Sequence, residues 1–122
     1  MTYAKLVRLA GIGIILTIWV LSLIPVDNIH VPGGDKSHHF IAYFTCMFVW
    51  GQLYLQPKAR LKLAITFILM GAAIECAQGG LTTYRFFEWL DMVANAIGVI
   101  SAWLVVTVQL SIQRRLNRQQ KT

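Results

Sequence analysis

Charged side chains are scarce in this sequence, and acidic ones are the scarcest. Of its 122 residues only five are Asp or Glu, and charged residues together make up 13%, about half of the usual share in a soluble domain. Hydrophobic residues make up 57%, and a chain this short has too little interior to hide them all from water. The composition therefore argues against a soluble protein, and the length leaves room for a single domain over residues 1–122.

Cysteine is also rare, which argues against a disulfide framework or a cysteine-based metal site. The two cysteines, Cys46 and Cys76, both lie in apolar stretches, and their spacing fits neither a disulfide framework nor a metal site. Free cysteine is by default a small, buried apolar residue. One histidine among scattered carboxylates is a weak metal signature. The sequence consequently predicts no metal and no cofactor.

The scarcity of charge leaves four long gaps between charged residues. Each gap reaches or exceeds the roughly 18 to 20 residues that cross a hydrocarbon core about 30 Å thick, and Glu75 is the only charged residue inside them when the histidines are neutral. In the last gap Ala94, Gly98 and Ala102 recur every four residues, which predicts a face where another backbone packs closely. We therefore predict an all-α membrane protein, a bundle of four transmembrane helices over residues 6–24, 37–55, 61–78 and 90–113.

The positive charges gather at one end of the predicted bundle. Only Lys36 and Arg85 lie in the connections at the other end. The remaining nine basic residues flank the opposite helix ends: Lys5, Arg8, Lys58, Arg60, Lys62, Arg114, Arg115, Arg118 and Lys121. This is the positive-inside pattern, and it predicts that both termini are cytoplasmic. We expect the basic tail to contact anionic membrane lipids, and we expect no nucleic-acid partner despite the net charge of +6.

Turn-forming residues indicate how the helices are connected. The pair Gln56–Pro57 is expected to end the second helix, and the short link after it makes the second and third helices antiparallel neighbours. Residues 25–34 are rich in Pro, Gly, Asp and Asn, which predicts a loop. The pair Gly79–Gly80 is expected to turn the chain before an aromatic stretch that ends at Trp89. That stretch is either a cover over the outer end of the bundle or an anchor in the headgroup layer.

Three pairs of polar residues lie near the outer ends of the predicted helices. Residues three or four positions apart share one face of a helix, so each pair presents its side chains together. At 1.5 Å per residue the second and third pairs reach similar depth, in the outer third of the membrane. Polar groups at matched height on three helices favour a site over unrelated structural contacts. The pairs are Asp35 with His39, Glu75 with Gln78, and Asp91 with Asn95.

Glu75 is the most informative of these residues. An ionisable group within a spanning helix costs roughly 2.5 to 3.5 kcal/mol, so it should face the bundle and have a partner. The candidate partners are the outer-side cations or potential cations His39, Arg85 and Lys36. His39 and Glu75 together could do general acid–base work. Tyr43, one turn below His39, either adds a hydroxyl group to the set or packs in the core.

The polar residues also follow the pattern of a membrane protein family. The string Asp35-Lys36-Ser37-His38-His39-Phe40-Ile41-Ala42-Tyr43 resembles the D-K-x-x-H-F-x-x-Y opening of the VanZ-like family. The pair Glu75-x-x-Gln78, the run Arg85-Phe86-Phe87 and the spacing Asp91-x-x-x-Asn95-x-x-Gly98 follow in the family's order. The resemblance covers residues 34–102. At Glu88 and its neighbours the sequence departs from the family, which often has Phe-Asp there, so Glu88 receives no family role.

The resemblance implies a four-helix protein of the bacterial cytoplasmic (inner) membrane. The family is named for a member linked to resistance against teicoplanin, a glycopeptide antibiotic that binds cell-wall precursors. Of the family's shared polar positions we predict His39 and Glu75 as the catalytic candidates. The predicted substrate-binding residues are Asp35, Lys36, Gln78, Arg85, Asp91 and Asn95.

Three functions stay open at this point. The preferred one is an envelope protein whose outer site binds, or binds and modifies, a lipid-linked or cell-surface substrate such as a cell-wall precursor, with Lys36 and Arg85 holding its anionic group. The second is a non-catalytic structural or accessory membrane protein in which the polar residues brace the helices. The third and weakest is a proton or solute carrier that uses Glu75. The sequence shows neither a broken helix nor an inverted repeat, which a carrier would be expected to have. The cytoplasmic half of the predicted bundle is expected to be apolar, so no polar path continues across it.

Overall fold

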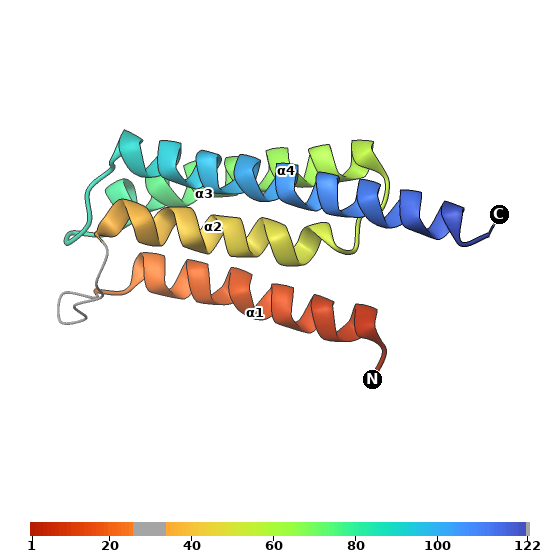
Figure 1. Cartoon of the computed structure of the whole chain (residues 1–122). Helices are drawn as coiled ribbons and strands as arrows, with labels where there is room; N and C mark the ends of the chain where they lie inside the picture. Colours follow the sequence, from red (N-terminus) through yellow and green to blue (C-terminus); the bar gives the residue numbers. More distant parts are fainter. Residues whose placement is uncertain (26–33, 122) are drawn as a thin grey trace.

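The described residues, 1–25 and 34–121, form four helices and no strand in the computed structural model (Figure 1). The helices are α1 (Tyr3–Leu23), α2 (Asp35–Gly51), α3 (Pro57–Leu81) and α4 (Trp89–Gln119). The prediction of an all-α protein is confirmed. From residue 26 to residue 33 the predicted loop lies outside the described residues.

Successive helices run in opposite directions, so the two ends of the bundle differ (Figure 1). Both termini and the link from α2 to α3 lie at one end, which we call the terminal end. The link from α3 to α4, which we call the 82–88 segment, lies at the other end, the polar end. Helix α2 packs against each of the other three helices, most extensively against α4, whereas α1 packs at the edge against α2 and α3.

Three of the helices, α1, α3 and α4, are long and apolar enough to cross a membrane. Large apolar side chains such as Leu16, Leu69 and Val108 are exposed along them, as expected for surfaces that face hydrocarbon rather than water. Helix α2 has 17 residues and rises about 26 Å, which is shorter than a hydrocarbon core about 30 Å thick. The structure thus supports a membrane protein with three helices of spanning length, not clearly the predicted four.

Helix α2 ends at Gly51, earlier than the predicted end at residue 55. The amides of Leu53 and Tyr54 bond to carbonyl groups only three residues back, at Trp50 and Gly51, which tightens the chain into turns. Pro57 does not end this helix. It begins α3 instead, at a position where a helix needs no amide donor.

Gly79 and Gly80 lie inside α3, which continues to Leu81, so the turn predicted at this pair is wrong. Gly79 has another role. A Cβ atom at this position would lie 2.9 Å from Cβ of Phe87 and 3.2 Å from its backbone nitrogen. The missing side chain lets the 82–88 segment lie directly on α3.

The α2–α4 interface is built on the small-residue face predicted for α4. A Cβ atom at Gly98 would lie 2.5 Å from the carbonyl oxygen of Phe40 and 3.1 Å from the backbone nitrogen of Phe44. Ala102, one turn further on, is completely buried. The close packing of the two backbones holds the polar residues at the start of α2 against those at the start of α4.

Candidate functional site

Eight polar residues meet at the polar end of the bundle, and we call them the polar cluster. They come from α2, α3, α4 and the 82–88 segment, at the end opposite both termini. The members are Asp35, Lys36 and His39 of α2, Glu75 of α3, Arg85 and Glu88 of the 82–88 segment, and Asp91 and Asn95 of α4.

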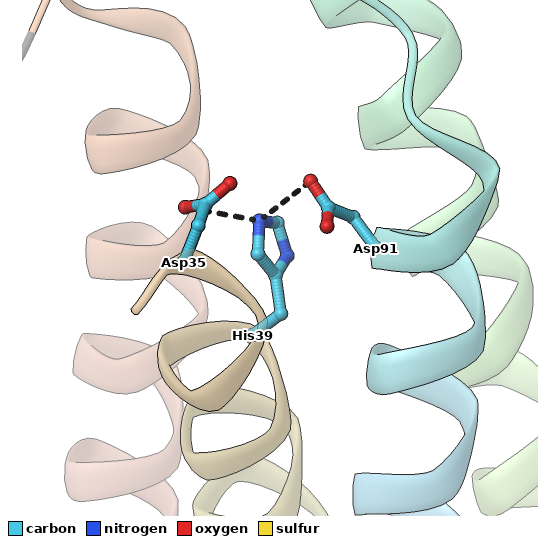
Figure 2. A group of neighbouring side chains, drawn as sticks. All are labelled: Asp35, His39 and Asp91. Atoms are coloured by element: carbon cyan, nitrogen blue, oxygen red, sulfur yellow. Dashed lines mark ion pairs between the residues drawn. The ribbon is translucent and has the colours of Figure 1, made fainter. Parts of the chain in front are cut away.

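The ring of His39, on α2, lies between the carboxylates of Asp35 and Asp91 (Figure 2). Its Nδ1 atom lies 3.0 Å from Oδ1 of Asn95. Its Nε2 atom lies 3.4 Å from Oδ2 of Asp91 and 3.9 Å from Oδ1 of Asp35. Because an amide oxygen only accepts hydrogen bonds, the Asn95 contact places the hydrogen of a neutral ring on Nδ1. The lone pair of Nε2 then faces two carboxylates.

Lys36 bridges two carboxylates of the polar cluster. Its Nζ atom donates to Oε2 of Glu88 at 2.9 Å and to Oδ1 of Asp91 at 3.0 Å. The hydrogen bonds to Glu88 and then Asp91 hold the pKa of Lys36 above its usual value. Arg85 lies at the edge, with Nη2 4.0 Å from Oδ1 of Asp35. The two cations predicted to hold an anionic group are therefore both next to carboxylates of the protein.

Glu75 is completely buried, as an ionisable residue of a spanning helix should be. Its Oε2 atom accepts a hydrogen bond of 3.3 Å from the backbone amide of Glu88. Its Oε1 atom lies 4.0 Å from Nδ1 of His39 and has no hydrogen-bond partner among the described residues. The hydroxyl group of Tyr43 is also buried and has no hydrogen-bond partner among the described residues. Tyr43 therefore belongs to the core rather than to the polar cluster.

Gln78 is the one predicted site residue that lies outside the polar cluster. Its side-chain amide donates to the carbonyl oxygen of Ser22 at 2.8 Å, which ties α3 to the end of α1. Gln78 and Glu75 are three residues apart, a rotation of about 60° around a helix with 3.6 residues per turn. That rotation turns Gln78 toward α1 while Glu75 faces α2 and α4.

The 82–88 segment has features of both a cover and an interfacial anchor. Its backbone closes over Glu75 through the amide of Glu88, and the Tyr84 hydroxyl group donates to the carbonyl oxygen of Leu23. The side chains of Phe86, Phe87 and the adjoining Trp89 are exposed instead. Exposed aromatic rings beside an apolar bundle are typical of the membrane–water interface.

Two groups of polar residues were not predicted from the sequence. Glu88, which received no role, is the partner of Lys36; its only sequence signal is its position three residues before Asp91. At the terminal end the Arg60 side chain is buried and donates to the carbonyl oxygens of Tyr54 at 2.9 Å and Leu55 at 2.8 Å.

The expectation of an apolar cytoplasmic half is therefore wrong for the terminal end. Gln52 and Gln109 also exchange side-chain hydrogen bonds of 3.2 and 3.3 Å there. Their isolated amides within apolar stretches were the available signal. Between Asn95 and Gln109 helix α4 buries only apolar residues, namely Gly98, Val99, Ala102 and Val106. These apolar residues separate the polar cluster from the polar residues at the terminal end. No continuous polar path therefore follows α4 across the bundle, which argues against a carrier.

The charge balance of the polar cluster shows what it can bind. Four carboxyl groups face two permanent cations, so the cluster has a net charge of −2 when His39 is neutral and all four carboxyl groups are ionised. Asp35, His39 and Asp91 each offer one ligand atom, and these atoms lie within 4.8 Å of one another. A histidine with a free ring nitrogen can also transfer a proton. The arrangement therefore suits cation binding and acid–base chemistry, and an anion only where it replaces a carboxylate partner.

No protein-family model matches the chain, and no curated protein or solved structure matches it. The resemblance to the VanZ-like family consequently rests on the motifs of the sequence alone.

Proposed function

We propose that the chain is a four-helix protein of the VanZ-like family in the bacterial cytoplasmic membrane, whose polar cluster binds a lipid-linked or cell-surface substrate of the envelope. The proposal rests on one observation, the convergence of eight polar residues from three helices and the 82–88 segment at one end of the bundle, which apolar residues of α4 separate from the polar residues at the terminal end. Polar groups at membrane depth are costly and mark sites by default.

The distribution of basic residues supports the topology of this proposal. Nine of eleven lie at the terminal end, which contains both termini, so this end faces the cytoplasm by the positive-inside rule. Helix α2 crosses together with the other three because it is held between them and its polar ends need not face lipid. The polar cluster then lies in the outer leaflet, at the level of lipid headgroups.

An anionic group of a lipid-linked substrate, such as a phosphate, fits the exposed edge of the polar cluster. Lys36 is half exposed, and so is its partner Glu88, whereas its other partner Asp91 is buried. A phosphate could therefore replace Glu88 while Asp91 keeps Lys36 in place. Arg85 is related in the same way to the exposed carboxylate of Asp35. His39, which contacts Asp91 and Asp35, the carboxylate partners of these cations, would accept or donate a proton if the substrate is modified.

The test measures binding and phenotype with the full chain in a membrane. Wild-type protein in vesicles should bind a polyprenyl-diphosphate-linked precursor, and its expression should raise the teicoplanin concentration that stops growth. Arg85→Ala should reduce both effects at an unchanged protein level. Arg118→Ala removes an exposed arginine at the terminal end and serves as the matched control. Full binding and full resistance in Arg85→Ala would contradict the proposal.

A structural role is the second candidate function, and specific contacts favour it. Lys36 and His39 of α2 each contact α4, through Asp91 and Asn95. Such contacts could serve only to hold the helices in register. The stability of variants distinguishes the two functions. Removing one partner of a structural brace destabilises the protein, whereas removing a residue of a binding site costs little stability.

A further inference from the structure

The Nε2 atom of a neutral His39 ring would turn its lone pair toward two carboxylates, and either a proton or a metal ion on Nε2 would make these contacts favourable. The ring is fixed by Asn95 at Nδ1, and Nε2 faces the carboxylates of Asp91 and Asp35 at 3.4 and 3.9 Å (Figure 2). A histidine that binds a metal through one ring nitrogen almost always donates its other N–H group to a carbonyl or carboxylate oxygen. Asn95 occupies the position of that supporting acceptor.

A second observation is a buried carboxyl group beside the His39 ring. Glu75 is completely buried behind the His39 ring, and its Oε1 atom has no hydrogen-bond partner among the described residues. The polar cluster as a whole has two more carboxylates than permanent cations. With all four carboxyl groups ionised, a divalent ion beside His39 would bring the net charge of the cluster to zero and would offset the field of this oxygen.

We propose that Asp35, His39 and Asp91 bind a divalent metal ion of the zinc class at the polar end of the bundle. This differs from the sequence-based expectation of no metal, because Asp91 is 52 residues away from His39 in sequence and the fold brings them together. One imidazole nitrogen with two carboxylate oxygens is a ligand set that Zn²⁺ accepts, whereas Mg²⁺ and Ca²⁺ prefer oxygen ligands alone.

The geometry requires only small side-chain movements. Zinc–ligand bonds of about 2.0–2.2 Å place the ligand atoms of a tetrahedral site about 3.4 Å apart. The Nε2 atom of His39 already lies 3.4 Å from Oδ2 of Asp91. Asp35 is half exposed and has to approach by only a small part of its side-chain length. Lys36 bonds the other oxygen of Asp91 and so orients this carboxylate toward the ion.

Three protein ligands leave a fourth position for water or substrate, as in catalytic rather than structural zinc sites. At the exposed edge of the polar cluster the ion would attract an anionic group more strongly than Lys36 and Arg85, which are next to carboxylates. This role toward substrate rests on the proposed function. Metal binding itself does not, and its failure would leave the proposed function to be tested separately.

The test is a metal titration of the full chain in detergent, with an affinity tag that contains no histidine. After treatment with a chelator and dialysis, Zn²⁺ binding is measured by calorimetry, and Co²⁺ binding by the visible absorption of the coordinated ion. Wild type should bind one equivalent of either ion per chain. A millimolar concentration of Mg²⁺ should not displace Zn²⁺.

The variants identify the ligands. His39→Gln and Asp35→Asn should each reduce the affinity for Zn²⁺ at least tenfold, and Asn95→Leu by about 10- to 100-fold through the orientation of His39. Asp35 is exposed, so its variant keeps the test valid if His39→Gln fails to fold. The matched control, His38→Gln, should bind like wild type. The absence of stoichiometric binding in wild type, or wild-type affinity in both His39→Gln and Asp35→Asn, overturns the proposal.

Discussion

The His39 ring of α2 lies 3.0 Å from the Asn95 side chain of α4, with Nδ1 facing Oδ1. Asn95 is buried and His39 nearly so, which means that water cannot replace either partner. The contact joins the two helices whose backbones approach each other closely at Gly98. It therefore couples the geometry of the polar cluster to the packing of the fold.

Asn95→Leu should destabilise the protein because it leaves the ring N–H group of His39 buried without an acceptor. A lost buried partner costs about 1–3 kcal/mol. The free energy of unfolding in mixed detergent, measured by denaturant titration, gives the loss. In a double-mutant cycle with His39→Leu, the coupling energy should be about 0.6 kcal/mol, and at most about 1.7 kcal/mol. Additive effects of the two substitutions would show that the contact does not form.

Gly98→Ala should weaken the α2–α4 interface although it adds only one methyl group. The added Cβ would lie 2.5 Å from the carbonyl oxygen of Phe40, and a helix backbone cannot move aside as a flexible side chain can. Overpacking of this kind costs about 1–3 kcal/mol.

The matched control for this change is Gly80→Ala, also within a helix. A Cβ atom at Gly80 would meet nothing within 4 Å, and alanine is favoured over glycine in a helix by about 1 kcal/mol. The two variants should therefore shift the unfolding midpoint in opposite directions. Equal shifts would contradict the close approach of α2 and α4 at Gly98.

Arg60→Met should destabilise the terminal end, because methionine keeps much of the apolar stem and removes the donors. The carbonyl oxygens of Tyr54 and Leu55 each lose a hydrogen bond from Nη1 of Arg60. We expect a loss of about 1–3 kcal/mol in the free energy of unfolding. Lys62→Met changes an exposed basic residue of the same helix and should stay within about 0.5 kcal/mol of wild type. Similar losses in both variants would mean that the hydrogen bonds of Arg60 contribute nothing to stability beyond its positive charge.

The helical periodicity and the gaps between charges were sufficient to predict much of the polar cluster. These two signals give the face and the depth of a residue on a long helix, and they predicted the common height of Glu75 and Asn95. They cannot predict residues in a segment without periodicity. Glu88 lies in such a segment, and its partner Lys36 is 52 residues away in sequence.

Other incorrect predictions have a different physical cause, which is that a neighbouring helix offers a polar side chain another hydrogen-bond partner. Gln78 was assigned to the same face as Glu75, but the rotation of about 60° between helix positions three residues apart brings it to the carbonyl group of Ser22 on α1. The early end of α2 depends on turns after Gly51 and on Arg60 from the next helix. Tertiary hydrogen bonds of this kind leave no trace in a hydropathy pattern.

Surface labelling should show that the two ends of the bundle lie on opposite sides of the membrane. We expect a membrane-impermeant maleimide to label Thr83→Cys in spheroplasts, and Asn117→Cys only after the membrane is permeabilised, because the positive-inside rule predicts a cytoplasmic location for the basic terminal end. Both positions are exposed. Cys76 is exposed and is replaced by alanine, whereas Cys46 is buried and is retained. Labelling of Asn117→Cys in intact spheroplasts would reverse the proposed orientation and place the polar cluster in the cytoplasm.

Glu75→Gln separates a binding site from a structural brace. Glutamine has nearly the same shape and keeps an oxygen that accepts from the amide of Glu88, while it removes a buried carboxyl group whose Oε1 atom has no partner among the described residues. If the polar cluster is a site, Glu75→Gln should melt at or above the wild-type temperature in detergent and lose binding of the lipid-linked precursor. Loss of one partner from a buried ionic brace instead costs about 3–5 kcal/mol. A large drop in melting temperature, with precursor binding retained by the folded fraction, would favour the brace over the site.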